Sequence, residues 1–132
     1  MVEPFYRSDA PGEGFFHPIV LYKDLPDNCR LVSEEQFGPA LALLPYKTVD
    51  EAVRRANDTS YGLGASVWGR DVERAASIAS RLQAGNVFVN QHPAMGPEIP
   101  YGGIRQSGIG VECGVAGLLQ YTNTVVLNIK RG

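Results

Sequence analysis

Cysteine and histidine are scarce in this sequence, which has two of each among its 132 residues. Cys29 and Cys113 are too few and too unpatterned for a disulfide framework or a zinc site. His17 and His92 have no second histidine or cysteine nearby that could complete a set of metal ligands. We therefore predict no metal site, and we expect both thiols to be free in a reducing cytoplasm.

Long apolar runs and an excess of charge of one sign are also missing. No run approaches the roughly 20 residues that span a bilayer, and no basic and then apolar signal peptide opens the chain. The formal net charge is -2, and acidic and basic residues are interspersed, so there is no basic stripe for nucleic acid. Because 44% of the residues are hydrophobic, we expect one soluble globular unit, with neither nucleic acid nor a membrane as its partner.

In the chain, continuous apolar runs alternate with segments whose apolar residues recur at helical spacing. Strands are predicted at four of these runs: one beginning near Ile19, and those at residues 41–46, 63–68 and 86–89. A capping box at Thr48–Glu51 opens one amphipathic helix, Asp71 can cap a second, and Gly85 is placed to supply the left-handed residue after it. Strand–helix–strand order is typical of right-handed crossover units. We therefore predict an α/β fold with a parallel sheet and covering helices.

The two ends of the chain differ from this central part. Prolines and glycines among polar residues make residues 1–14 a predicted loop without order. Apolar spacing indicates a short helix within Val111–Leu119, and β-branched residues predict a strand at Asn123–Ile129. We accordingly divide the chain into three parts: a lead-in at residues 1–14, a packed region at 15–121 and a C-terminal strand at 122–132.

The loop at residues 91–110 has three prolines and five glycines, too many for regular structure. A loop of this length inside a compact domain is usually functional or disordered. Met95 and Tyr101 could line a pocket beside a sheet edge, or they could only plug the core. The glycines permit positive φ or close backbone approach. They do not form a dinucleotide fingerprint, because that motif directly follows a strand and opens a helix.

The stretch Glu34–Pro39 places two carboxylates, an aromatic ring and a Gly-Pro break just before an apolar run. By itself it is typical of a solvated loop. Four further motifs follow it along the chain: Tyr61-Gly62-Leu63, Asn86–Asn90, Pro100–Gly108 and Gly110-Val111-Glu112. In order and spacing, the five motifs closely resemble the C-terminal part of the aldehyde dehydrogenase superfamily. The resemblance runs from about Gly14 to the end of the chain.

This resemblance implies a partial aldehyde dehydrogenase catalytic domain over residues 15–121 and the family's oligomerisation strand over 122–132. Members of the family oxidise an aldehyde to a carboxylic acid, using a cysteine thiolate to attack the carbonyl and NAD or NADP to accept hydride. The sequence departs from the family with Tyr101 where Phe is usual and Arg105 where Lys is usual. Both changes keep the class of side chain, so they bear on substrate preference more than on membership.

Five side chains carry over from the family's binding sites. Glu35 matches the glutamate that accepts hydrogen bonds from the nicotinamide ribose, and an ionised carboxylate is a strong bidentate acceptor. Phe37 matches the aromatic beside the nicotinamide, and Leu63 corresponds more loosely to an apolar contact near the same ring. Met95 and Tyr101 resemble positions that line the aldehyde tunnel.

The family's nucleophile, general base and cofactor domain lie upstream of the part that this chain resembles, so we expect no catalytic residue here. The first hypothesis is a segment of a truncated or split NAD(P)-dependent aldehyde dehydrogenase, inactive alone, which forms a homo-oligomer or associates with a complementary fragment. The alternative is a regulatory module that docks on full-length dehydrogenase subunits. A self-sufficient enzyme using Cys29 or Cys113 ranks last, because neither has a histidine near it in sequence. The aldehyde, and the choice between NAD and NADP, stay open.

Overall fold

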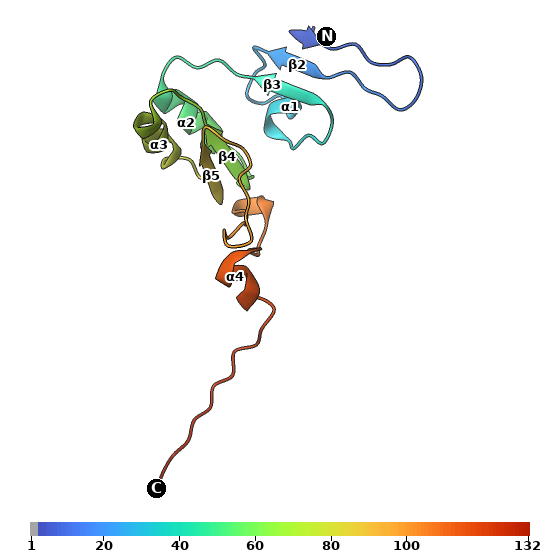
Figure 1. The fold of residues 1–132 in the computed structure, drawn as a ribbon. Helices are drawn as coiled ribbons and strands as arrows, with labels where there is room; N and C mark the ends of the chain where they lie inside the picture. The colour runs from blue at the N-terminus through green and yellow to red at the C-terminus, as the bar shows by residue number, and fades with distance from the viewer. Residues whose placement is uncertain (1–2) are drawn as a thin grey trace. The chain divides into compact units, whose positions relative to one another are not determined.

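The computed structural model of the chain describes residues 3–132, which form two compact units divided between Thr48 and Val49 (Figure 1). Each unit contains its own sheet, one of three strands and one of two. The α/β class is confirmed, because strands alternate with helices and a parallel strand pair occurs in each sheet. The parallel pairs are divided between the two sheets, β2 with β3 in one and β4 with β5 in the other. Among residues 3–132, no helix is long and apolar enough to cross a membrane.

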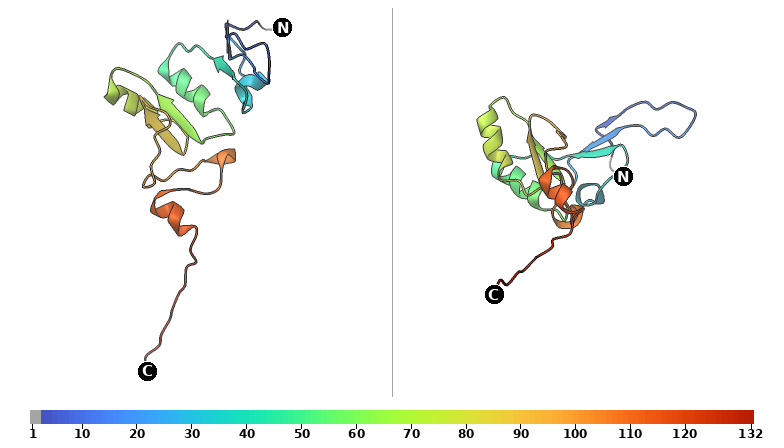
Figure 2. Two further views of the ribbon diagram at one scale, coloured as in Figure 1. Left: turned by 45° about the vertical axis from the view of Figure 1, so that its right-hand side comes forward. Right: turned by 60° about the horizontal axis from the view of Figure 1, so that its bottom comes forward.

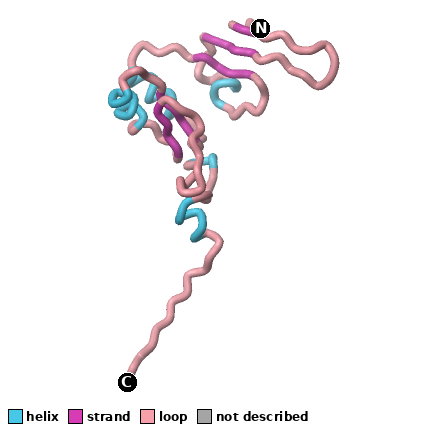
Figure 3. The backbone as a smooth tube through the Cα atoms, viewed as in Figure 1, coloured by secondary structure: helices cyan, strands magenta, loops and turns pink. Residues whose placement is uncertain are grey.

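The first unit is a mixed sheet with one short helix, coloured by element type in Figure 3. Its elements are β1 (Tyr6–Arg7), β2 (Val20–Lys23), α1 (Arg30–Ser33) and β3 (Ala40–Leu43). The strand order is β1-β2-β3, with β2 and β3 parallel and Val20 opposite Ala40. Val20 and Leu25 are the buried apolar residues of this unit. The predicted strands near Ile19 and at 41–46 are therefore present: β2 begins one residue later than expected, and β3 begins one residue earlier and ends three residues earlier.

Strand β1 lies inside the segment that we predicted to be loop, so the structure differs there from the expectation for residues 1–14. Tyr6 and Arg7 pair antiparallel with Leu21 and Val20. The Phe5 N–H also donates to the Leu21 carbonyl oxygen at 2.8 Å. Proline lacks the N–H that a ladder needs, but Pro4 and Pro11 lie outside the paired residues, so they do not prevent this edge strand.

The second unit holds two parallel strands joined through a helix. Its elements are α2 (Val49–Asn57), β4 (Gly64–Val67), α3 (Val72–Ala79), β5 (Asn86–Val89), the 3₁₀ helix η1 (Arg105–Ser107) and α4 (Gly114–Leu119). Helix α3 packs alongside β4 and β5, as the views in Figure 2 show. Val53, Ala75, Ala79 and Phe88 are buried and form the core of the unit. Burial of these apolar side chains drives the packing of helix on sheet.

The helix signals in this unit were read correctly, with one exception. Helix α2 begins at Val49, within the predicted capping box, and Asp71 caps α3 by accepting a hydrogen bond from the Arg74 N–H at 3.0 Å. Gly85 is not left-handed, contrary to prediction, because α3 already ends at Ala79. Its Cβ would instead overlap the Gly102 carbonyl oxygen. The position therefore needs glycine for close approach and not for a special φ.

The strand predicted at Asn123–Ile129 is not formed within the chain. These residues are extended beyond α4, and Val125 and Leu127 are 85% and 80% exposed. A β-strand exists only where a neighbouring strand accepts and donates its backbone hydrogen bonds. None of the residues that the structure describes provides that neighbour, so β propensity alone did not produce a strand.

Candidate functional site

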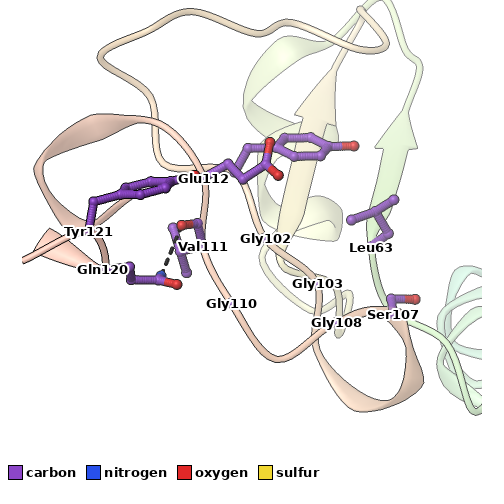
Figure 4. Close-up of a pocket in the computed structure, with 11 residues that line it drawn as sticks. Leu63, Gly102, Gly103, Ser107, Gly108, Gly110, Val111, Glu112, Gln120 and Tyr121 are labelled. Atoms are coloured by element: carbon purple, nitrogen blue, oxygen red, sulfur yellow. Dashed lines mark hydrogen bonds between the residues drawn. The ribbon is translucent and has the colours of Figure 1, made fainter. Parts of the chain in front are cut away.

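The second unit contains an open pocket of about 380 Å³ beside the glycine-rich loop (Figure 4). Its walls come from the segment before β4, from the loop after β5, and from the end of α4. The lining residues are Leu63, Tyr101, Gly102, Gly103, Ser107, Gly108, Gly110, Val111, Glu112, Gln120 and Tyr121. The pocket thus combines aromatic and apolar side chains with a carboxylate, a hydroxyl and backbone polar groups.

One wall of the pocket is fixed by a bridge between Tyr101 and Glu112. The Tyr101 N–H donates to the Glu112 carbonyl oxygen at 2.8 Å, and the Glu112 N–H donates back to Tyr101 at 2.7 Å. Residues directly opposite each other in an antiparallel pair extend their side chains to the same face. The Tyr101 ring and the Glu112 carboxylate therefore both line this pocket.

Two segments of the loop, around Gly102-Gly103 and around residues 107–110, approach each other closely through their backbones. A Cβ on Gly102 would lie 2.7 Å from the Gly110 carbonyl oxygen, and one on Gly103 would overlap Ser107. The Gln120 side chain donates from Nε2 to the Val111 carbonyl oxygen at 2.9 Å, which ties the end of α4 to the same loop (Figure 4). Larger residues at 102 or 103 would force these segments apart.

Ser107 joins the loop to the segment before β4. Its Oγ accepts a hydrogen bond from the Gly62 N–H at 2.9 Å, and the Gly62 carbonyl oxygen accepts one from the Ile104 N–H at 3.0 Å. Gly62 is therefore bound on both sides by the loop. Leu63, the next residue, is held where its side chain can face the pocket.

Arg105 fastens the loop at a second point, outside the pocket. Its Nη1 donates to the carbonyl oxygens of Asn57 at 2.9 Å and Thr59 at 2.7 Å, and its Nη2 donates to the Gln83 side chain. The planar guanidinium can reach several acceptors at once, which a single ammonium group does less well. Arg105, where the family usually has Lys, therefore makes contacts to three residues that a lysine could not all make.

The structure brings together two of the five predicted site residues. Leu63 and Tyr101 both line the pocket. Met95 does not line it and is 62% exposed in the preceding part of the loop. Glu35 and Phe37 lie in the first unit, before β3, where the Phe37 ring is 95% exposed. The binding roles of all five residues remain predictions.

The adjacent glutamates of the first unit differ in their partners. Glu34 accepts two hydrogen bonds from the Arg30 guanidinium, both of 2.9 Å. The side-chain hydrogen bond from Arg30, and then the charge of Arg30, lower the pKa of Glu34. Glu35 is exposed and makes no side-chain hydrogen bond or ion pair with the residues that the structure describes. Its carboxylate is free to accept hydrogen bonds from another molecule.

Sequence reasoning missed several pocket residues because the contacts that bring them together are not local. Glu112 was noticed within a motif, but nothing in its neighbourhood indicates pairing with Tyr101. Ser107 was likewise noticed only as part of a motif, and Gln120 and Tyr121 carry no spacing signal. Among residues 3–132, no three histidine, cysteine or acidic side chains lie close enough together to hold a metal ion. His92 packs its ring edge-on against Phe88, with 5.4 Å between centroids.

Comparison with known sequences gives one consistent family. The profile described as "Aldehyde dehydrogenase family" matches residues 4–127. Aldehyde dehydrogenase 1A1 of Gallus gallus is 41% identical over 118 residues, which are 89% of this chain and 23% of that protein. The putative aldehyde dehydrogenase FUS7 of Gibberella fujikuroi is 42% identical over 112 residues, 85% of this chain and 24% of its own length.

Solved structures agree with the sequence comparison. A Mycobacterium tuberculosis aldehyde dehydrogenase, complexed with NAD+, superposes with a TM-score of 0.85 at 34% identity, covering 92% of this chain and 26% of that one. A mutant of aldehyde dehydrogenase C from Pseudomonas syringae, complexed with NAD+ and octanal, has a TM-score of 0.76 at 47% identity, covering 82% and 22%. The chain spans only about a quarter of the length of such relatives. On sequence and structure together, this chain belongs to the aldehyde dehydrogenase family.

Proposed function

We propose that this chain supplies part of the cofactor and substrate surface of an NAD(P)-dependent aldehyde dehydrogenase, which oxidises an aldehyde to a carboxylic acid. The match to the family over residues 4–127 carries the proposal. Further support comes from the relative complexed with NAD+ and octanal, which is 47% identical to this chain. NAD or NADP, when bound, accepts the hydride that leaves the aldehyde.

Glu35 and Phe37 are the residues that would hold the cofactor. The ribose of a nicotinamide nucleotide presents two neighbouring hydroxyls, and a free carboxylate can accept a hydrogen bond from each. Glu35 fits this need because its carboxylate has no partner among the described residues, whereas that of Glu34 is taken by Arg30. The exposed Phe37 ring offers an apolar surface of the kind that packs on a nicotinamide. Leu63 adds a second apolar contact.

Tyr101 and Met95 are the residues that we assign to the aldehyde. Tyr101 lines the pocket described above, so its ring can exclude water from a bound aldehyde. Met95 is exposed in the same loop, and its flexible thioether suits an apolar contact with substrate. The Tyr101 hydroxyl, absent from the usual Phe, gives this chain a hydrogen-bonding group at a position that is otherwise apolar.

We propose that the nucleophile and the base come from additional protein and that this chain does not catalyse the oxidation alone. Neither of its free thiols lines the pocket. Cys29 and Cys113 instead immediately precede α1 and α4. The catalytic groups would come from a longer form of this protein or from a complementary fragment. Two free thiols also fit the cytoplasmic location that we propose.

A second role, as a regulatory module, rests on the C-terminal segment. Val125, Val126 and Leu127 are 85%, 76% and 80% exposed, so this segment offers a row of apolar side chains and unpaired backbone groups. Such a segment can add as a strand to the sheet of another subunit. We propose that residues 122–132 join this chain to a second copy or to a full-length dehydrogenase subunit.

The test is a dehydrogenase assay of the purified chain with NAD and with NADP over a series of aldehydes. The chain alone should give no turnover, and mixing it with the upstream fragment of a relative should restore turnover. Each fragment alone serves as the control. Turnover by the chain alone that disappears when Cys29 and Cys113 are alkylated would establish the self-sufficient enzyme instead. A change in the activity of a full-length relative, without complementation of the fragment, would favour the regulatory role.

A further inference from the structure

Asn86, the first residue of β5, is a buried polar side chain of the second unit. It is 9% exposed and lies opposite Gly64 in the β4–β5 ladder. A buried carboxamide must make hydrogen bonds, because burying an unpaired amide costs more free energy than the bond itself contributes. The role of the Asn86 side chain can therefore be inferred from its hydrogen-bond partners.

Both partners of Asn86 belong to residues that line the pocket. Its Nδ2 donates to the Leu63 carbonyl oxygen at 3.1 Å and to the Gly102 carbonyl oxygen at 2.9 Å. Because both acceptors are carbonyl oxygens, the nitrogen end of the carboxamide must face them. Asn86 itself does not line the pocket. Asn86 therefore binds the backbone of two pocket-lining residues without facing the pocket.

We propose that Asn86 is a positioning residue, which sets the separation of the two pocket walls that carry Leu63 and Tyr101. One N–H of the Asn86 amide donates to the backbone of Leu63, and the second N–H donates to Gly102, the residue directly after Tyr101. Gly85 permits this arrangement, because any Cβ there would push the Gly102 carbonyl away. The spacing of the pocket is thus set by one amide group and the missing side chain beside it.

Asparagine is specific at this position because the site needs two N–H donors on a short side chain. Asp has the same shape but would present carboxylate oxygen to two carbonyl oxygens, which repel it. Ser has one O–H donor and can keep only one of the two bonds. Asn86→Asp should therefore lose the hydrogen bonds to both pocket walls, and Asn86→Ser should lose one of them.

Asn90, the exposed residue directly after β5, is the control. Its Nδ2 donates to the Gly69 carbonyl oxygen at 2.9 Å, and its Oδ1 accepts from the Gly69 N–H at 2.7 Å. Neither Asn90 nor Gly69 lines the pocket. Asn90→Asp therefore removes a carboxamide donor next to the same strand, at a side chain that does not bind the pocket walls.

Amide hydrogen exchange of the full chain provides the test, read at the loop amides that are hydrogen-bonded: Ile104, Gln106 and Glu112. Asn86→Asp should speed exchange at these amides by roughly ten- to a hundredfold, while α2 and α3 stay protected. Asn86→Ser should move them in the same direction by less. The carbonyl ¹³C resonance of Gly102 should shift in Asn86→Asp, because its hydrogen bond is lost.

The control separates positioning from general damage. Asn90→Asp should lose the bond to the Gly69 carbonyl oxygen, keep an acceptor for the Gly69 N–H, and leave the loop amides unchanged. Equal loop exchange in the two Asp variants, or a uniform loss of protection across the unit in Asn86→Ser, would overturn the proposal. If Asn86→Asp does not fold, the loop amides and the Gly102 resonance of Asn86→Ser decide. No aldehyde or cofactor enters this test, so its outcome is independent of the proposed function.

Discussion

Two stretches of the second unit differ in opposite ways from what their residues favour. Residues 101–112 are rich in glycine, which disfavours regular structure, yet backbone and side-chain hydrogen bonds to distant segments hold them. Residues 123–132 are β-prone, yet they make no backbone hydrogen bond to any residue that the structure describes. Partners for the backbone, more than local preference, decide which stretch is fixed.

The first unit repeats this comparison with two neighbouring carboxylates. Arg30 binds Glu34, and Glu35 beside it is left without a partner among the described residues. A group that the chain itself holds serves the fold, whereas one left free is available to another molecule. Five experiments test this distinction.

The largest effect should follow removal of residues 122–132, because they contain the free stretch at 123–132. We expect the full chain to sediment as a dimer or larger assembly at micromolar concentration and the truncated chain to shift toward monomer or to aggregate. Val125→Lys with Leu127→Lys in the full-length chain should weaken assembly without removing the backbone. A full-length chain that already sediments as a compact monomer would contradict this expectation.

Gly85→Ala should cause the largest loss of stability, because the new Cβ overlaps the Gly102 carbonyl oxygen of the held stretch. We expect unfolding free energy to fall by about 3 kcal/mol, measured from the urea midpoint. Gly69→Ala is the control, since its Cβ would meet Ala75 at an ordinary 3.6 Å. Equal midpoints for the two variants would show that the close approach at Gly85 carries little energy.

Glu35→Gln tests whether the free carboxylate binds the cofactor. In an enzyme restored by complementation, kcat/KM at limiting NAD should fall by an amount corresponding to ~1–3 kcal/mol, the range for a charged hydrogen bond. Glu34→Gln is the matched control, because that carboxylate is bound to Arg30 and should leave cofactor kinetics unchanged. Unaltered kinetics in Glu35→Gln would remove Glu35 from the site.

Arg105→Lys tests one fastening of the held stretch. A lysine keeps the charge but cannot bind the two carbonyl oxygens and the Gln83 side chain as a planar fork does. We expect a loss of about 1 kcal/mol, which lowers the melting temperature of a unit of this size by roughly 4–8 °C. Arg70→Lys, at an exposed arginine with no partner among the described residues, should leave the melting temperature unchanged.

The smallest effect should come from titrating Glu34. Because Arg30 lowers its pKa in the folded chain below the ordinary 4.5, the ion pair stabilises α1 above about that pH, and this stabilisation is lost as the pH falls through the folded value. An NMR titration of the Glu34 carboxyl should therefore give a lower pKa in the native chain than in Arg30→Ala. Identical titration curves would mean that solvent screens the pair completely.

The sequence predicted those elements whose signals are local. The stripe from Val49 to Ala56 and the cap at Asp71 placed α2 and α3, and the apolar runs placed β4 and β5. These signals work because side-chain periodicity and capping act within a few residues. The pairing of β1 with β2 had no such signal, since it depends on a partner far along the chain.

The candidate site was predictable only in part, for the same reason. Leu63 and Tyr101 were identified by resemblance, and the structure places both at one pocket. Their common wall depends on Asn86, whose importance is invisible until its two carbonyl partners are known. Gly85 was assigned the wrong cause, because a glycine needed for φ and one needed for space look identical in a sequence.

The contact from Arg105 to Asn57 also has a consequence for the order of folding. Asn57 is the last residue of α2, and its carbonyl oxygen receives the guanidinium from 48 positions further along the chain. On a growing chain, the Asn57 side chain can bind Arg81 and Gln83 as soon as α3 and the turn after it are made, but the Asn57 carbonyl oxygen cannot receive Arg105 until β5 and the loop have been synthesised. The long separation makes the contact costly in loop entropy. We therefore expect this contact to form late, after the Asn57 side chain has already joined the end of α2 to the segment before β5.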